Sequence, residues 1–348
     1  MKHYKWFTLC AALCVLILFS FSTATFGQSQ TKPIELKVTS WTPPQLPIAK
    51  LTEEWGRKVE EQSGGQVKLV FYWAGALASY RDHYRVAQTG VADICNWVFG
   101  NIAGLHTLNE FTSLPLIGWD NIYTATKVYH EMRKKFPELD GEFKGLRNIY
   151  TTAMAPNQFH FTKKTVKTIE DMRGMRIMGG SSWADFMKSL NAVVVAKGPP
   201  DWYMSLQKGL VDGHFTHWPA FDGFKLEELA SSHTEAGDAG FGLNMYGWWI
   251  NEKSWNKLPK EAQKAFIDLQ PWVEQEDLKL NTKLIDHARA QAEKMGHPIV
   301  KLTPEERERF AQVVLPIHKK WIADQEAKGL PGKAVYEEAK KLIAQYTK

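Results

Sequence analysis

Short stretches of β-forming residues alternate with helical stretches along the first third of this 348-residue chain. Residues 35–41, 67–73 and 92–99 are rich in β-branched and aromatic side chains, which favour strands. Between them, residues 48–59 show the three- to four-residue apolar spacing of an amphipathic helix, and residues 79–88 form a polar, helix-like stretch. Because such alternation builds a parallel sheet covered by helices, the order predicts an α/β fold.

The same alternation starts again in the middle of the chain. Strands are predicted over residues 148–154, 175–178 and 192–197, and helices over residues 181–190 and 201–209. A chain of this length can form two hydrophobic cores. The sequence therefore predicts a second domain of the same α/β class.

Long helices are predicted for the C-terminal part of the chain. Residues 260–295 are nearly continuous in helical pattern, with Pro271 as a kink or a helix start. Thr303 can cap a further helix, which begins with proline and two acids and runs to about Lys328. A last helix follows to the C-terminus.

The first 27 residues have the layout of a secretory signal peptide. Lys2 and Lys5 precede an apolar run over residues 7–21, and small and polar residues follow, with cleavage expected after Ala24 or Gly27. The apolar run is shorter than the roughly 20 residues that span a bilayer, although an N-terminal anchor helix is the alternative. We therefore expect export to the periplasm.

Charge and cysteine content restrict the classes of function. The chain has 43 Lys and Arg against 38 Asp and Glu, and loss of the signal peptide removes two lysines and no acid, which leaves a net charge of +3. This mild, dispersed charge does not suggest a nucleic-acid partner. Cys95 would be the remaining cysteine, so no intramolecular disulfide is expected, and its apolar neighbours predict a buried residue rather than a nucleophile.

Motifs for catalysis are absent from the sequence. It contains no Gly-x-Ser-x-Gly elbow, phosphate-binding glycine loop, Cys-x-x-Cys pair or His-Glu-x-x-His pair. His214 and His217 stand three residues apart, but no third metal ligand is evident near them. The sequence therefore predicts a protein that is not an enzyme and has no cofactor or metal.

Tryptophan is unusually abundant, with 14 in the chain. Several fall at turns or predicted strand ends: Trp41, Trp73, Trp97, Trp183, Trp202, Trp218, Trp248 and Trp249. Ligands of α/β folds bind outside the carboxyl edge of the sheet, and aromatic walls are typical of small-molecule pockets. We expect some of these side chains to line such a pocket and the others to fill cores.

Several segments in the same order resemble one family of binding proteins. They are residues 63–77, 87–104, 169–180, 205–221, 224–235 and 248–266. Together they resemble the DctP family, the solute-binding proteins of tripartite ATP-independent periplasmic (TRAP) transporters. The resemblance covers about residues 35 to 290.

The resemblance implies a two-domain periplasmic-binding-protein clamshell with parallel-type sheets and an interlobe cleft. It places lobe I at residues 28–152, with a return near 244–260, and lobe II at residues 153–243. Residues 244–348 would supply a crossover strand and the long helices that pack on both lobes. The resemblance also implies a small-molecule solute, commonly an organic acid, and a partner permease with a small and a large membrane subunit.

In this family two arginines usually clamp the ligand's carboxylate, and this sequence has no arginine at the corresponding positions. The strand arginine that holds the acid corresponds to Met178, and a second arginine would fall near Asn157. Two explanations remain open. A relocated cation, which could be Arg176, Arg81 or Arg85, holds the acid, or the ligand is less acidic and more aromatic than usual.

The predicted ligand-binding residues follow from strand ends and from the resemblance. On lobe I they are Trp41, Trp73 and Asn96, and on lobe II they are Asn157, Arg176, Met178, Thr216, His217 and Trp218. The last three belong to residues 212–218, which are expected to form a polar loop. Two other functions stay open at this point, a receptor that feeds a signalling protein and a periplasmic enzyme on the same fold.

Overall fold

The structure, a computed structural model, describes residues 32–100 and 104–347. The predicted signal peptide lies outside these residues. The chain divides into a short N-terminal unit and a unit spanning Ile34–Lys348, and the second is described below. None of the helices in the described ranges carries an apolar stretch long enough to cross a bilayer.

Five strands form the first sheet, in the order β2-β1-β3-β10-β4. Their bounds are β1 (Ile34–Thr39), β2 (Val67–Tyr72), β3 (Ile94–Val98), β4 (Leu146–Ala153) and β10 (Met245–Asn251). The pairs β1–β2 and β1–β3 are parallel, whereas β10 runs antiparallel to both β3 and β4. The four strands predicted over residues 35–41, 67–73, 92–99 and 148–154 are confirmed within one or two residues of their ends.

Six strands form the second sheet, in the order β11-β9-β5-β8-β6-β7. Their bounds are β5 (Asn157–Phe161), β6 (Arg176–Gly179), β7 (Val193–Ala196), β8 (Gly213–His217), β9 (Ser232–Glu235) and β11 (Ile299–Lys301). The prediction that residues 212–218 form a polar loop is wrong, because β8 pairs with both β5 and β6 and is buried along most of its length.

The strand directions follow from the path of the chain between the two sheets. Of the strands described, β10 in the first sheet and β5 in the second run against their neighbours. Each is the first strand after the chain has crossed from the other sheet. A strand that arrives at the carboxyl edge of a parallel sheet can only run back toward the amino edge. The sheets are therefore of the parallel type, with a reversed strand at each of the first two crossings. After the third crossing, through α10 (Lys260–Lys294), β11 runs parallel to β9.

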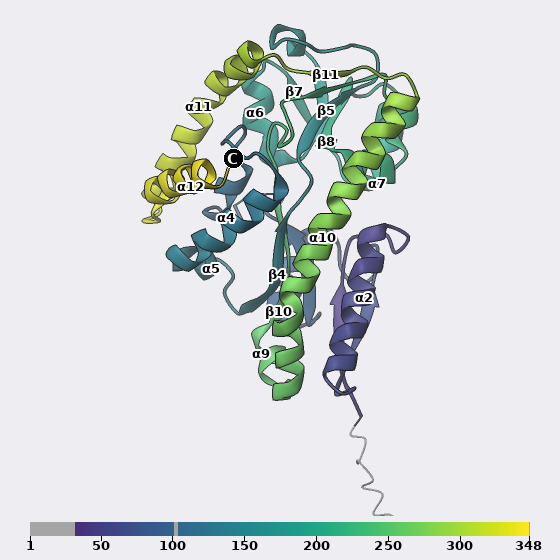
Figure 1. The fold of residues 1–348 in the computed structure, drawn as a ribbon, viewed down its shortest axis with the longest axis vertical. Helices are drawn as coiled ribbons and strands as arrows, with labels where there is room; N and C mark the ends of the chain where they lie inside the picture. Colours follow the sequence, from purple (N-terminus) through teal and green to yellow (C-terminus); the bar gives the residue numbers. More distant parts are fainter. Residues whose placement is uncertain (1–31, 101–103, 348) are drawn as a thin grey trace, which may run out of the picture. The chain divides into compact units, whose positions relative to one another are not determined.

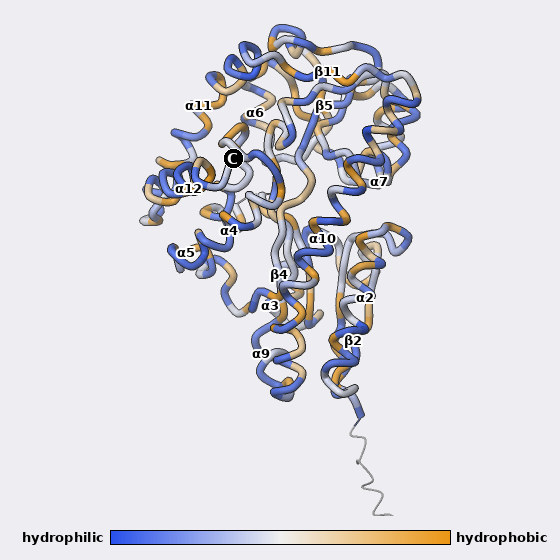
Figure 2. The backbone as a smooth tube through the Cα atoms, in the orientation of Figure 1, coloured by the Kyte–Doolittle hydropathy of each residue, from blue (hydrophilic) through white to orange (hydrophobic). Residues whose placement is uncertain are grey.

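Helices cover both sheets, as Figure 1 shows. The α-helices are α2 (Pro47–Gln62), α3 (His83–Thr89), α4 (Ile122–Lys135), α5 (Pro137–Gly141), α6 (Ala184–Ser189), α7 (Pro199–Gln207), α8 (Trp218–Gly223), α9 (Glu252–Asn256), α10 (Lys260–Lys294), α11 (Pro304–Ala327) and α12 (Gly332–Tyr346). Short 3-10 helices are η1 (Tyr80–Asp82), η2 (Asn109–Ser113), η3 (Glu170–Met172), η4 (Ser181–Trp183) and η5 (Leu226–Glu228). Figure 2 shows hydrophobic and hydrophilic positions alternating along α2, as expected of a helix with one buried face.

The long helix α10 packs on elements of both sheets. It contacts α2 and β4 on the side of the first sheet and α8 on the side of the second. Pro271 lies inside this helix and does not end it. The residue four positions earlier, Ile267, is 50% exposed, so water can satisfy the carbonyl that proline leaves without a donor. The predicted cap of the next helix is confirmed, since Thr303 accepts a hydrogen bond from the Glu306 amide at 3.2 Å.

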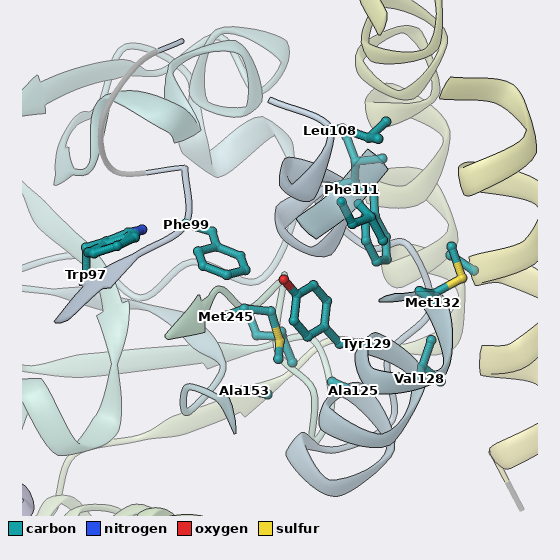
Figure 3. Packing of buried hydrophobic residues seen from close by; sticks show 14 of the residues in the cluster. Trp97, Phe99, Leu108, Phe111, Ala125, Val128, Tyr129, Met132, Ala153 and Met245 are labelled. Atoms are coloured by element: carbon teal, nitrogen blue, oxygen red, sulfur yellow. The ribbon is translucent and has the colours of Figure 1, made fainter. Parts of the chain in front are cut away.

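Aromatic side chains fill the first sheet's two faces. On one face Trp97 and Trp249 stack with ring centroids 4.1 Å apart. Figure 3 shows Phe99 of this cluster between Trp97 and Tyr129. On the other face Trp55 packs against Tyr150, Trp248 and Phe266. The tryptophans at positions 97, 248 and 249 therefore belong to cores rather than to a pocket. Cys95 is fully buried, and burial raises the pKa of its thiol.

Asp277 is a carboxyl group in the interior of the protein, only 1% exposed. From α10 its Oδ2 accepts a hydrogen bond from Oγ1 of Thr152, next to the last residue of β4. Its Oδ1 has no hydrogen-bond partner in the described part of the chain. Burial raises the pKa of Asp277 to about 7, against the hydrogen bond from Thr152, which lowers it.

This burial predicts a pH dependence of stability. The folded chain holds the Asp277 proton more tightly than the unfolded chain, whose pKa is near the ordinary value of 3.8. The stabilising contribution is therefore complete below about pH 4 and is lost as the pH rises to about 7. Asp277→Asn cannot ionise, so its free energy of unfolding relative to wild type should increase by about 2–4 kcal/mol between pH 4 and pH 8. Urea denaturation at several pH values measures this difference.

Asp286→Asn, at an exposed position of the same helix, is the matched control and should give a constant difference from wild type over this range. Taking differences also cancels the opposite contribution of the buried histidines. A constant difference for Asp277→Asn would contradict the prediction.

Candidate functional site

A cavity of about 930 Å³ lies where the ends of strands from both sheets come together. Its lining includes residues at or just beyond the carboxyl ends of six strands and at the amino ends of the two reversed strands. These are Trp41, Ala74, Val98, Gly179, Ala196 and His217 at carboxyl ends, and Asn157 and Asn244 at the amino ends of β5 and β10. The position agrees with the rule that α/β folds bind ligands outside the carboxyl edge of the sheet.

Aromatic side chains form the walls of the cavity on both sides. Trp41 packs edge-to-face on Tyr80, with ring centroids 5.7 Å apart, on the side of the first sheet. On the other side Trp202 packs on Phe224 at 5.0 Å, and its Nε1 donates to the carbonyl of Lys197 at 3.0 Å. These rings are half-buried, so each presents an apolar face to a ligand.

The buried part of the lining is polar but uncharged. Asn157, His214 and Thr216 are 9%, 1% and 5% exposed and lie on the adjacent strands β5 and β8. The side chain of Asn157 makes no hydrogen bond within residues 32–100 and 104–347. Nδ1 of His214 is buried and has no partner among the same residues. Burial lowers the pKa of His214 to about 3, so its ring is neutral at pH 7.

His217 links the cavity lining to helix α8. Its Nδ1 accepts a hydrogen bond from the amide of Ala220 at 3.1 Å and so caps the helix. Burial lowers the pKa of His217 to about 4. Because Nδ1 is an acceptor and the ring is neutral, the proton is on Nε2, and His217 can act as a hydrogen-bond donor through that atom.

Two cations lie at the exposed margin of the cavity. Arg81 comes from η1 beside the first sheet, and Lys197 follows β7 of the second sheet. Both side chains are exposed, and neither makes a hydrogen bond or ion pair with the described residues. The residues that line the cavity include no Asp or Glu. The margin is therefore suited to an anionic group.

Four of the nine predicted site residues line the cavity: Trp41, Asn157, Thr216 and His217. The other five lie elsewhere. Trp73 stacks on Phe71 and donates to Glu53, and Asn96 donates to the Tyr246 hydroxyl in the core of the first sheet.

The remaining three predicted residues belong to the second sheet or to α8 and are not part of the cavity lining. Met178 is fully buried behind the cavity wall, in a cluster on which Trp202 and Phe224 pack. Arg176 stands at the amino end of β6, the edge opposite the cavity, and forms a two-point ion pair with Asp212 at 2.7 and 3.1 Å. Trp218 is 2% exposed and packs against His160. Of the three arginines considered as a relocated cation, the cavity includes Arg81, while Arg85 pairs with Asp82.

Sequence reasoning did not single out several of the lining residues: Tyr80, Lys197, Tyr203, His214, Phe224 and Asn244. A signal was available for one of them. Lys197 ends a predicted strand just before the Gly198–Pro200 break, where the carboxyl-edge rule applies directly. His214 could not have been assigned in this way, because the strand that carries it was taken for a loop.

A buried ion pair holds α8 and the neighbouring His217 against α10. Trp218 donates from Nε1 to Oε1 of Glu235 at 2.8 Å, and Arg289 of α10 donates to Oε2 at 2.9 Å. Glu235 is only 3% exposed, and burial raises its pKa despite the nearby arginine. The cavity wall at His217 is thus tied to the long helix.

Further histidines form a chain behind the cavity wall. His297, His233 and His160 are linked at 3.3 and 2.8 Å, and His160 contacts the carbonyl of Thr216 at 3.2 Å. A carbonyl can only accept, so His160 Nε2 carries a proton and the donors point from His297 toward Thr216. No group of three or more potential ligands in the described part of the chain is arranged to hold a metal ion.

Known proteins resemble this chain in sequence. The profile of the family DctP, described as bacterial extracellular solute-binding protein, family 7, matches residues 38–325. The uncharacterized protein YiiZ of Salmonella typhimurium is 26% identical over 165 residues, which are 45% of this chain and 49% of YiiZ. The chain thus matches about half the length of that curated relative.

Solved structures resemble the chain over most of its length. A marine metagenome TRAP solute-binding protein specific for aromatic acid ligands, in complex with 3-hydroxybenzoate, is 24% identical, with a TM-score of 0.84 over 91% of this chain and 100% of that protein. A TRAP periplasmic solute-binding protein from Bordetella bronchiseptica with bound (R)- and (S)-mandelate is 26% identical, with a TM-score of 0.78 over 90% and 100%. The chain has the two-domain clamshell fold of these proteins.

The ion pair at Glu235 predicts the effect of removing its cation. Arg289→Met leaves a buried carboxylate without a partner, which should lower the free energy of unfolding by about 3 kcal/mol. The double variant Glu235→Gln/Arg289→Met should recover more than half of this loss, because the uncompensated charge is gone. Urea denaturation at pH 7 measures both.

Arg309→Met removes an exposed ion pair on α11 and is the matched control, with an expected change below about 1 kcal/mol. Equal losses for the two single variants would show that burial of Glu235 does not matter.

Proposed function

The chain belongs to family 7 of the bacterial extracellular solute-binding proteins, and we propose that it is the receptor of a TRAP-type secondary transporter that captures a small organic acid with an aromatic or apolar body. One observation carries the proposal. The cavity of about 930 Å³ takes its lining from both sheets, and it combines aromatic walls with two unpaired cations and no carboxylate. Such a site matches an amphipathic anion in size and in chemistry.

The two-sheet lining explains how capture is signalled. A solute that contacts residues from both sheets binds the closed arrangement of the lobes more tightly than the open one, so occupancy favours closure. Trp41 and Arg81 supply contacts from the first sheet, and Asn157, Thr216 and His217 supply them from the second. In this proposal the lobes have the bounds expected from the sequence, with lobe I at residues 28–152 and a return near 244–260, and lobe II at residues 153–243.

Aromatic acids are the favoured ligand class. The half-buried rings of Trp41 and Trp202 offer stacking surfaces, and the margin offers positive charge. Structural relatives were solved with 3-hydroxybenzoate and with mandelate, both acids that carry a ring. The two explanations for the missing arginine clamp therefore combine, because the site has a cation in a new place and an aromatic lining.

The proposal includes a cellular location and a membrane partner. The predicted signal peptide and the family description support a periplasmic protein, and the resemblance to TRAP receptors supports a permease with a small and a large membrane subunit. The role is binding without catalysis, in keeping with relatives that are solute-binding proteins.

Isothermal titration calorimetry tests the proposal. Benzoate, mandelate and phenylacetate are expected to bind with one site per chain, and succinate at the same concentrations to give no heat of binding. Trp202→Ala removes part of the cavity wall and should weaken the binding of aromatic acids by about ten- to a hundredfold. Trp272→Ala, which truncates a half-buried tryptophan of α10 outside the cavity lining, should leave the Kd unchanged.

Binding of succinate in preference to every aromatic acid would exclude the proposed ligand class. Mass spectrometry of the protein from its native host, under non-denaturing conditions, would then identify what the cavity holds.

A further inference from the structure

We infer that the ligand's carboxylate lies at the exposed margin of the cavity, between Arg81 and Lys197, and that the opposite end of the ligand is a neutral hydrogen-bonding group that reaches the side chain of Asn157. The cargo would then be an aromatic monocarboxylic acid with a hydroxyl or carbonyl group at the end remote from the acid. This inference rests on the proposed function and adds the orientation of the ligand and its second polar group.

The inner wall cannot hold a carboxylate. The fully buried lining residues are all uncharged: Val98, Ala155, Asn157, Gly179, Trp183, His214, Phe215, Thr216 and Asn244. Met178, at the position expected for the clamping arginine, is packed in another core. A carboxylate placed inside would lose its hydration without gaining a cation, which is strongly unfavourable.

The histidines do not change this balance. Burial lowers the pKa of His214 to about 3 and that of His217 to about 4, so both rings are neutral at the pH at which a periplasmic receptor works. Their environment also opposes protonation, because a charge on the nearby His217 would repel one on His214, and the ring of Trp202 packs against His214 at 4.7 Å. The inner wall is therefore neutral as well as polar.

The exposed margin of the cavity supplies the positive charge that its buried wall does not have. Arg81 and Lys197 are exposed and unpaired in the described part of the chain, and they stand on different sheets. A carboxylate that contacts both receives two charge-assisted hydrogen bonds and keeps part of its hydration. It also links the two lobes, so the same contact that selects an acid favours closure.

The inner end of the cavity selects for a second polar group. Asn157 is opposite His217, so it stands at the end of β5 where the chain enters the second sheet. Its side chain is buried and makes no hydrogen bond with the described residues. A ligand hydroxyl or carbonyl can pair with this amide, whereas a purely hydrocarbon end leaves it unpaired and binds more weakly.

The size of the cavity fits such a ligand. At about 930 Å³ it lies in the upper part of the range for small-molecule sites. A bare benzoate, held at the margin by its acid, would leave the inner wall without a contact. A longer acid with a polar group at its far end can reach both ends at once.

Three related compounds separate the two ends of the ligand. They are 3-(4-hydroxyphenyl)propionate, its analogue without the hydroxyl, 3-phenylpropionate, and its uncharged analogue, 3-(4-hydroxyphenyl)propionamide. Calorimetry with each compound gives two ratios of Kd. The ratio of amide to hydroxy acid measures the preference for the carboxylate, and the ratio of 3-phenylpropionate to hydroxy acid measures the preference for the hydroxyl. For wild type both ratios should favour the hydroxy acid, and the preference for the carboxylate should be about ten- to a hundredfold.

Two variants assign each ratio to one end of the cavity. Arg81→Met/Lys197→Met should abolish the preference for acid over amide and keep the preference for the hydroxyl. Asn157→Leu should do the reverse. Arg85→Met/Lys208→Met changes the net charge equally at exposed residues outside the cavity lining and should keep both preferences. Thermal unfolding of each variant verifies that it is folded.

The outcomes distinguish orientation from function. If Asn157→Leu removes the acid preference while Arg81→Met/Lys197→Met keeps it, the acid lies inside and the inferred orientation is wrong, although the receptor role stands. If wild type binds none of the three compounds but binds benzoate or mandelate, the inferred cargo is wrong, although the proposed aromatic class stands. The salt concentration gives an independent test. Raising it should weaken the binding of the acid, whose carboxylate lies at the exposed margin, and leave the binding of the amide unchanged.

Discussion

The path of the chain between the two sheets is the constraint on which the site depends. The chain leaves the first sheet after Ala153, enters the second at Asn157, and returns to the first at Met245. Each entry strand starts at the carboxyl edge of its new sheet and runs backward through it. The carboxyl edges of both sheets are therefore brought to the same place as the crossings. The cavity lies there because both groups of strand ends and both connections meet there.

The long helix α10 and the buried polar groups around it connect this region to the rest of the fold. Asp277 bonds to Thr152 just before the first crossing, and Arg289 pairs with Glu235, which in turn fixes Trp218 beside the cavity wall. Each of these buried polar groups needs its partner, because an unpaired polar or charged group in the interior lowers the stability of the fold. One helix thus has polar attachments to both sides of the molecule, and a change of lobe arrangement must accommodate both.

The sequence predicted the elements better than the site. Strands and helices with clear periodicity, such as residues 67–73 and 260–295, appear within a few residues of their expected bounds. Residues 213–217 were missed as a strand because three polar side chains, His214, Thr216 and His217, interrupt the expected apolar pattern. That polarity is the mark of a strand whose end faces a cavity. Arg176 looked like a replacement clamp by strand alternation, but it stands at the opposite end of β6 and pairs with Asp212.

By itself, the sequence determined the class of fold and the family, because these depend on local pattern and on residue identity. The tertiary structure alone decided which polar side chains meet. Arg81 and Lys197 are 116 positions apart and face one cavity from different sheets, while His214 is neutral because the fold buries it. Burial and long-range proximity arise only when the sheets are assembled. For that reason the placement of charge at the margin and of neutral polar groups inside could not be derived from the order of residues.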